Sequence, residues 1–298
     1  MATRHLLLVA ALAGAASAQP APTKITIGIF APSVEFGAAK ARLAYVQGLA
    51  KAIEQSTGIQ TLAQSYANLR ALEKDKLDFA IIDGQCYAAN PTWKLLATAN
   101  IGGAARTWAL FSSAGGDLQA LAGKKLAFIA TGCNDAGFID NVMLESEVDP
   151  AFFGARVGKP DLIGAVAEVA SYKTAQAVFA PVGSAKGLTK VFETGSVPNP
   201  AFVELGGKLP QAIVDKVAAS VTGYGRGGAI AGWTKAPREL YTAFAARFGK
   251  VTKAGVLAPP EPVVLDARDV LIEPATLDDT ALVDVRHHFV RPPGARLE

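Results

Sequence analysis

Residues that commonly hold metal ions are scarce in this chain of 298 residues, which has only two cysteines and three histidines. Outside the N-terminal segment, the histidines are His287 and His288, adjacent to each other near the C-terminus. Two thiols and two neighbouring imidazoles do not have the spacing of a zinc site. We therefore expect neither a metal site nor another cofactor.

Runs of basic residues are also missing. The formal net charge is +3, and the lysines and arginines are scattered along the chain. Nucleic-acid-binding proteins usually concentrate basic residues in a patch, so we expect no nucleic-acid partner. The Gly-x-Ser-x-Gly motif of serine hydrolases is absent, and no histidine lies near a candidate nucleophile. No catalytic residue is predicted, and the protein is not expected to be an enzyme.

Long apolar runs are confined to the N-terminus. The run Leu6–Ala16 follows Arg4 and His5 and ends in the small residues Ala16-Ser17-Ala18. It is too short to cross a bilayer comfortably, and its flanks are typical of a secretory signal peptide. We therefore expect residues 1–18 to be a signal peptide cleaved near Ala18. The mature protein would be exported and would have no membrane span.

Half of the residues are hydrophobic, which in a chain of this length is enough for two modest domains. Short apolar runs alternate with amphipathic segments in the first part of the chain. This alternation predicts strands at 25–30, 59–65 and 78–82, and helices at 38–56 and 68–76. The β-α-β-α-β order with short connections is typical of a mostly parallel α/β sheet.

A second α/β segment is predicted after residue 104. Its extended pieces are expected at 107–112, 125–130, near 162 and at 176–179, and its helices at 137–148, 165–171 and 184–193. The chain is then expected to return near 201–205 to the first segment, with a helix at 210–220, a strand at 229–233 and a helix at 237–248. From residue 256 onward, frequent prolines predict a C-terminal extension of short β-rich pieces.

Two stretches carry a family resemblance. The first is Asp117–Phe128, with a Gly-Lys-Lys turn before a strand, followed by Thr131-Gly132 and Gly137-Phe138. The second is the piece 72–82 together with Tyr87. In these residues the chain resembles the solute-binding proteins of ABC importers, and most of all their phosphonate- and phosphate-binding branch. By organisation, the resemblance covers roughly residues 24–250.

The resemblance implies a periplasmic-binding-protein fold of type 2, an α/β fold with two lobes. Each lobe would be a mostly parallel sheet flanked by helices, and two crossover strands would join them. The implied division is lobe 1 at 24–104, lobe 2 at 105–204, a return to lobe 1 at 205–258 and the extension at 259–298. It also implies a periplasmic protein that holds a small polar solute between the lobes and delivers it to an ABC permease.

The resemblance places the ligand-facing loops at strand ends. The candidate ligand-binding residues on these loops are Ser33, Tyr66, Asp83, Gly84, Gln85, Tyr87, Thr131, Gly132, Asn134 and Asp135. Phosphonate binders carry a hydroxyl-rich turn where this chain has Cys133-Asn134-Asp135. Because an unpaired Asp135 would repel an anion, the solute is expected to be either a phosphonate-like anion or an amine-bearing compound. Trp108 is expected either to pack in the core or the hinge or to stack on a ligand.

Cys86 and Cys133 fall in these loops, one in each lobe. They are either two separate, partly buried thiols or a disulfide, which an exported protein can form. A bond between them would contribute about 4 kcal/mol in the chain-entropy model and would oppose opening of the lobes. This leaves an alternative function, a non-transporting interaction or scaffold protein that has kept the fold.

Overall fold

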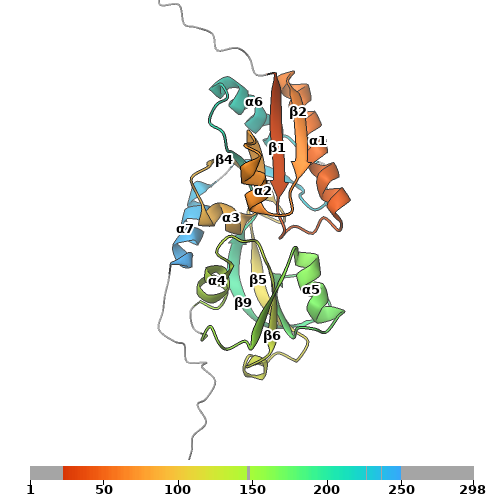
Figure 1. Cartoon of the computed structure of the whole chain (residues 1–298), viewed down its shortest axis with the longest axis vertical. Coiled ribbons are helices and arrows are strands. Elements are labelled where there is room, and N and C mark those ends of the chain that lie inside the picture. The colour runs from red at the N-terminus through yellow and green to blue at the C-terminus, as the bar shows by residue number, and fades with distance from the viewer. Residues whose placement is uncertain (1–22, 146–147, 226, 236, 250–298) are drawn as a thin grey trace, which may run out of the picture. The chain divides into compact units, whose positions relative to one another are not determined.

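The computed structural model describes residues 23–145, 148–225, 227–235 and 237–249 (Figure 1). All of these residues belong to one compact unit. The signal peptide expected at 1–18 and the extension expected at 259–298 lie outside the described residues.

Lobe 1 is built on a six-stranded sheet with the order β11-β4-β10-β3-β1-β2. Strand β1 is parallel to β2 and β3, and β10 and β11 join antiparallel to their neighbours. The strands are β1 (Lys24–Phe30), β2 (Gln60–Ser65), β3 (Phe79–Ile82), β4 (Lys94–Asn100), β10 (Ala201–Glu204) and β11 (Gly232–Lys235). The accompanying helices are α1 (Ala39–Thr57), α2 (Leu69–Lys74), α3 (Gly84–Ala89), α6 (Gln211–Thr222) and α7 (Arg238–Phe248).

Lobe 2 is built on a five-stranded sheet with the order β7-β6-β8-β5-β9. Strand β6 is parallel to β7 and β8, and β5 is antiparallel to β8 and β9. The strands are β5 (Ala105–Ser112), β6 (Lys125–Ile129), β7 (Ala155–Lys159), β8 (Ala177–Pro181) and β9 (Thr189–Pro198). The helical segments are the short η1 (Gln119–Leu121), α4 (Asp135–Gly137), the π-helical turn η2 (Phe138–Met143) and α5 (Leu162–Ala170).

The chain passes between the two sheets twice, from β4 to β5 and from β9 to β10. These two passages are the crossovers that the family resemblance implies, and the two-lobed α/β fold is confirmed. Helix α7 contacts both lobes, because Tyr241 belongs to an apolar cluster of lobe 1 and Phe244 to the apolar cluster of lobe 2.

The buried strands form where the sequence is most apolar. Ile25, Ile27 and Ile29 of β1 are fully buried, and all four residues of β3 are buried as well. Such near-continuous apolar strands are typical of parallel sheets that are covered on both faces. Asn68 caps α2 by accepting a hydrogen bond from the backbone N–H of Ala71, as asparagine commonly does at a helix N-terminus.

Three predictions for lobe 2 are wrong. No helix forms over 184–193, because the chain turns at Gly187, which has a φ of 81°, and then enters β9. The short strand expected near 162 lies earlier, at β7, and Leu162 begins α5. The helix expected at 137–148 is replaced by α4 and η2, which ends at Met143.

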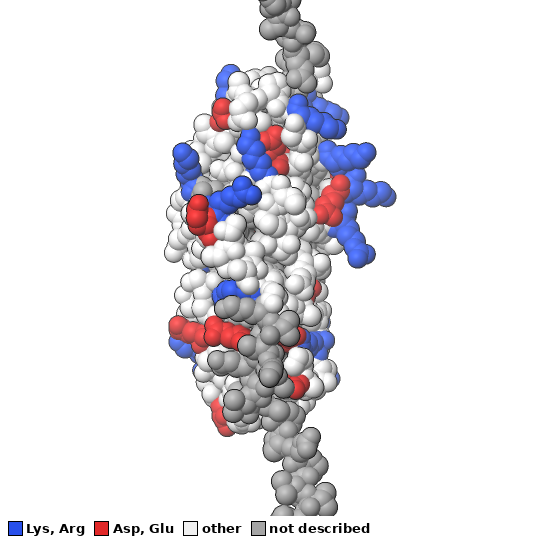
Figure 2. All heavy atoms as spheres, turned by 90° about the vertical axis from the view of Figure 1, so that its left-hand side faces the viewer, with Lys and Arg blue, Asp and Glu red and all other residues white. Residues whose placement is uncertain are grey.

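Charged residues of both signs are interspersed on the face shown in Figure 2. This distribution agrees with the small formal net charge of +3. Within the described part of the chain, none of the helices combines the length and the apolar character that crossing a bilayer requires.

Candidate ligand-binding site

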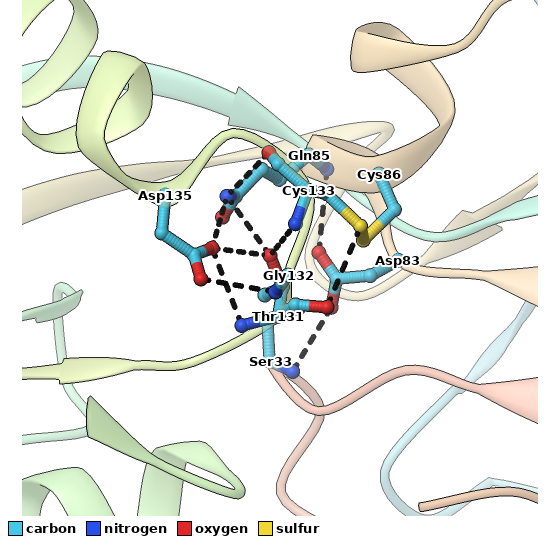
Figure 3. The surroundings of a disulfide bond; sticks show 8 residues. All are labelled: Ser33, Asp83, Gln85, Cys86, Thr131, Gly132, Cys133 and Asp135. Carbon is cyan, nitrogen blue, oxygen red and sulfur yellow. Dashed lines mark hydrogen bonds between the residues drawn. A yellow bond between two sulfur atoms is a disulfide. The ribbon is translucent and has the colours of Figure 1, made fainter. Parts of the chain in front are cut away.

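Two strand-to-helix turns, one from each lobe, meet between the lobes (Figure 3). The lobe 1 turn joins β3 to α3 and contains Asp83, which is buried and caps the helix. One carboxylate oxygen of Asp83 accepts a hydrogen bond from the Gln85 backbone N–H at 3.3 Å. The other accepts from the Ser33 backbone N–H at 3.0 Å. Asp83 therefore fixes the loop after β1 against the start of α3.

The charge of a half-buried cation, Arg106, acts on this carboxylate. Arg106, on β5, donates to the side-chain oxygen of Asn199 at 2.9 Å and to the backbone oxygen of Ser33 at 3.1 Å. Burial raises the pKa of Asp83, and hydrogen bonds from Ser33 and Gln85 and the charge of Arg106 oppose this rise. Burial lowers the pKa of Arg106, and the charges of Asp83 and Glu35 oppose that change.

Gln85 connects the two lobes directly. Its side-chain nitrogen Nε2 lies 3.0 Å from Thr131 Oγ1, 3.1 Å from the backbone oxygen of Cys133 and 2.9 Å from Asp135 Oδ1. All three acceptors belong to the turn that joins β6 to α4 in lobe 2. The side chain of one lobe is thus held by three oxygens of the other.

The Asp135 carboxylate occupies the hydrogen-bond donors of its own turn. It accepts from the backbone N–H groups of Thr131 at 3.2 Å and of Gly132 at 2.9 Å. It also accepts from the Thr131 hydroxyl and from Gln85 (Figure 3). The sequence predicts that an unpaired Asp135 would repel an anion. The structure shows that the carboxylate is paired, and that it uses donors that an anion would otherwise need.

A disulfide links Cys86 of α3 to Cys133 of the lobe 2 turn, with 5.0 Å between the two Cα atoms. The pairing that the sequence left open is therefore present. On another side of the junction, the backbone N–H of Leu162, the first residue of α5, donates to the backbone oxygen of Pro32 at 3.0 Å. The lobes are joined by covalent and hydrogen-bonded contacts around the site.

A cavity of about 10 Å³ lies between these contacts. That volume holds about one water molecule. Its polar lining is Ser33, Asp83, Gln85 and Thr131, and its apolar lining is Trp108, Phe128, Ile129, Phe138, Ile139, Phe179 and Val197. Among the described residues, the indole nitrogen Nε1 of Trp108 is the one buried side-chain nitrogen or oxygen without a hydrogen-bond partner.

The structure brings together most of the residues predicted to bind a ligand. Ser33, Asp83, Gln85 and Thr131 line the cavity. Gly132 and Asp135 lie beside it, in the hydrogen-bond network of Figure 3. Asn134 lies farther out, where it is exposed and accepts from the backbone N–H of Gly137 as the cap of α4. Gly84 packs against the backbone of Pro198 and Asn199.

The two predicted aromatic candidates lie elsewhere, in the core of lobe 1. The Tyr66 hydroxyl donates to Asp75 at 2.7 Å. The Tyr87 ring packs edge-on against Tyr241, with 4.8 Å between the ring centroids, and its hydroxyl donates to the backbone oxygen of Trp93. The aromatic rings that line the cavity come from lobe 2 instead, and the Trp108 ring meets Phe138 edge-on.

Comparison with known proteins identifies solved structures that have a similar fold. No family model and no curated protein sequence matches this chain. Its structure is similar to that of the binding-protein component of an ABC phosphonate transporter from Pseudomonas aeruginosa. That match has 14% sequence identity, a TM-score of 0.57, and coverage of 76% of this chain and 87% of that chain.

Two further solved structures match equally well. A phosphonate-binding protein from Prochlorococcus marinus, in complex with methylphosphonate, is 11% identical, with a TM-score of 0.57 and coverage of 75% of this chain and 96% of that one. A Xanthomonas citri protein bound to ATP is 12% identical, with the same TM-score and coverage of 77% and 98%. The chain therefore has the fold of periplasmic solute-binding proteins and is similar in structure to their phosphonate-binding branch.

Proposed function

We propose that this protein is an exported solute-binding protein that holds a small polar solute between its two lobes and delivers it to a membrane permease. The observation that carries the proposal is the meeting of two strand-to-helix turns, one from each lobe, beside one cavity lined by both polar and apolar side chains. Clefts at the carboxyl ends of parallel strands are where α/β folds commonly bind ligands.

Export to the periplasm is part of the proposal. It is supported by the N-terminal run Leu6–Ala16 and the small residues that follow it. The disulfide between Cys86 and Cys133 also supports it, because structural disulfides persist in oxidising compartments.

The test is a thermal-shift screen of the mature protein against phosphonates, sulfonates, amines and neutral polar compounds. A ligand that binds only the folded state stabilises it by about 2.7 kcal/mol at 100 times its Kd, so a true solute should raise the melting temperature. Gly249→Ala, at the end of α7 and outside the turns that carry the predicted ligand-binding residues, is the control variant and should retain binding. The absence of a shift with every class would contradict a solute-binding role.

A second candidate function is a non-transporting interaction or scaffold protein. Two observations favour it: a covalent bond joins the lobes, and the cavity between them is only about 10 Å³. Small-angle scattering with and without reductant addresses this candidate. A radius of gyration that increases only on reduction, together with no solute binding in the oxidised form, would support it. Solute binding by the oxidised protein would exclude it.

A further inference from the structure

We propose that the site between the lobes recognises a primary ammonium group, and that Gln85 Nε2 occupies the ammonium position while the lobes are closed. This inference rests on the proposed solute-binding function and gives it a ligand class. It starts from the three oxygens that surround Gln85 Nε2: Thr131 Oγ1, Cys133 O and Asp135 Oδ1.

The first argument counts hydrogens. A carboxamide nitrogen carries two hydrogens, whereas three acceptors lie within 3.1 Å of Gln85 Nε2. The backbone oxygen of Cys133 can only accept, as can an ionised Asp135, so the nitrogen end of the carboxamide faces them. A protonated primary amine has three hydrogens. It can give one to each oxygen, which the glutamine side chain cannot do.

The second argument concerns charge. Asp135 brings a carboxylate to this group of acceptors, and a hydrogen bond between two charged groups is stronger than one between neutral groups. The backbone N–H groups of Thr131 and Gly132 already donate to Asp135, as does the Thr131 hydroxyl. An oxyanion at this turn would face a carboxylate and donors that are already in use. The turn therefore favours a cation over a phosphonate or sulfonate.

The third argument comes from the aromatic side chains that line the cavity. Trp108 is 97% buried and lines the cavity, and its indole N–H has no hydrogen-bond partner among the described residues. It can donate to an oxygen of the ligand. The rings of Phe128, Phe138 and Phe179 form the apolar wall, which suits a short hydrocarbon body and attracts a nearby cation. These features point to a small amino alcohol or a similar primary amine.

The size of the cavity sets the binding mode. About 10 Å³ is too small for such a molecule, so the Gln85 side chain must leave its three acceptors when the ligand enters. Gln85 thus competes with the ligand for one position. Shortening this side chain should strengthen amine binding, whereas neutralising Asp135 should weaken it.

The experiment measures the binding of ethanolamine and n-propylamine to the disulfide-intact protein by isothermal titration calorimetry at neutral pH. Tetramethylammonium is the matched cation without N–H groups, and methylphosphonate is the anion. We expect both amines to bind and neither control to do so. Gln85→Ala should bind the amines about tenfold more tightly, and Asp135→Asn about tenfold more weakly, as expected for the loss of a hydrogen bond to a charged group.

Trp108→Phe provides a readout that a general structural defect would not give. It should weaken the binding of ethanolamine, which has a hydroxyl oxygen, and leave that of n-propylamine unchanged. Circular dichroism and the melting temperature establish that each variant is folded.

The possible failures can be told apart. Binding of methylphosphonate without binding of amines would overturn this inference and leave the proposed function standing. Equal binding of tetramethylammonium and the amines, or unchanged amine affinity in Asp135→Asn, would also overturn it. Failure of every compound class to bind would overturn the proposed function itself.

Discussion

At the residue scale, Gly84 has the least room for a side chain. A Cβ atom there would lie 2.0 Å from the backbone oxygen of Pro198 and 2.9 Å from that of Asn199. Because both obstacles are backbone atoms, Gly84→Ala must displace α3 from the crossover. We expect a loss of about 1–3 kcal/mol, typical of overpacking, measured by urea denaturation.

The control for this variant is Gly249→Ala, at the end of α7. Gly249 has a φ of −90°, and apart from its neighbours in the chain no described residue lies within 4 Å of the place its Cβ would occupy. The Gly249→Ala substitution should therefore leave the free energy of unfolding nearly unchanged. A similar loss in both variants would show that close packing at Gly84 is not the cause.

Asp83 makes stability depend on pH in a direction unusual for a carboxylate. Burial raises its folded pKa above the unfolded value of about 3.9, so the folded protein holds more protons between the two values. The stability contributed by its protonation is fully present below the unfolded pKa and is lost as pH rises through the folded pKa. Wild type should therefore gain stability relative to Asp83→Asn as the pH falls from neutral to about 4.

Urea unfolding of both proteins across this pH range measures the difference. Asp83→Asn has a similar shape but cannot titrate, so the pH dependence of the difference isolates the Asp83 carboxyl group. Two curves that run parallel from neutral pH to about 4 would show that Asp83 titrates alike in the folded and unfolded states.

At the scale of elements, the start of α5 supports both a helix and a contact between the lobes. The Asp161 carboxylate accepts from the Gly164 backbone N–H at 2.8 Å, and the next residue, Leu162, donates to Pro32 in lobe 1. Asp161→Ala should cost about 1 kcal/mol through loss of the cap. Asp161→Asn retains an accepting oxygen and should lose much less. Thermal unfolding of the two variants compares them.

Strands with a strong local signal could be predicted from the sequence, and strands defined mainly by their partners could not. The apolar runs of β1 and β3 and the Asn68 cap of α2 are local features. Strand β9 alternates buried and exposed residues irregularly, and it is held by its long pairing with β5. Such pairing is set by tertiary contacts and outweighs local propensity.

The candidate site could be predicted only in part, because only some of its residues have a local signal in the sequence. Residues directly after strand ends, such as Asp83 and Thr131, follow from the order of strands and helices. The aromatic wall was not predictable, because Trp108, Phe128 and Phe179 come from three strands that meet only in the folded sheet. Tyr87 also follows a strand end, but its ring turns into the core toward Tyr241.

At the scale of the whole molecule, the disulfide contributes to the unfolding free energy and can be removed by reduction or by substitution. It spans 47 residues, which corresponds to about 4 kcal/mol of unfolding free energy in the chain-entropy model. The double variant Cys86→Ala/Cys133→Ala should melt on the order of 10 °C lower than the oxidised wild type. Differential scanning calorimetry measures this.

Wild type treated with reductant is the companion to the double variant, and it should show a similar decrease in melting temperature. If the variant and the oxidised wild type melted together, the bond would not constrain the unfolded chain. Mapping of disulfide-linked peptides in the exported protein gives the oxidation state to which the melting data refer.

The close approach of Gly84 to Pro198 also has a consequence for motion. It sets the start of α3, two residues before Cys86, against the passage from β9 to β10. Points near a rotation axis move least, so a bond beside this passage would restrain rotation of the lobes less than a bond far from it. The contact between Leu162 and Pro32 is a hydrogen bond, which can break while the disulfide stays intact. In this arrangement, the disulfide-bonded protein would keep a hinge rotation between the lobes and lose the twisting of one lobe against the other.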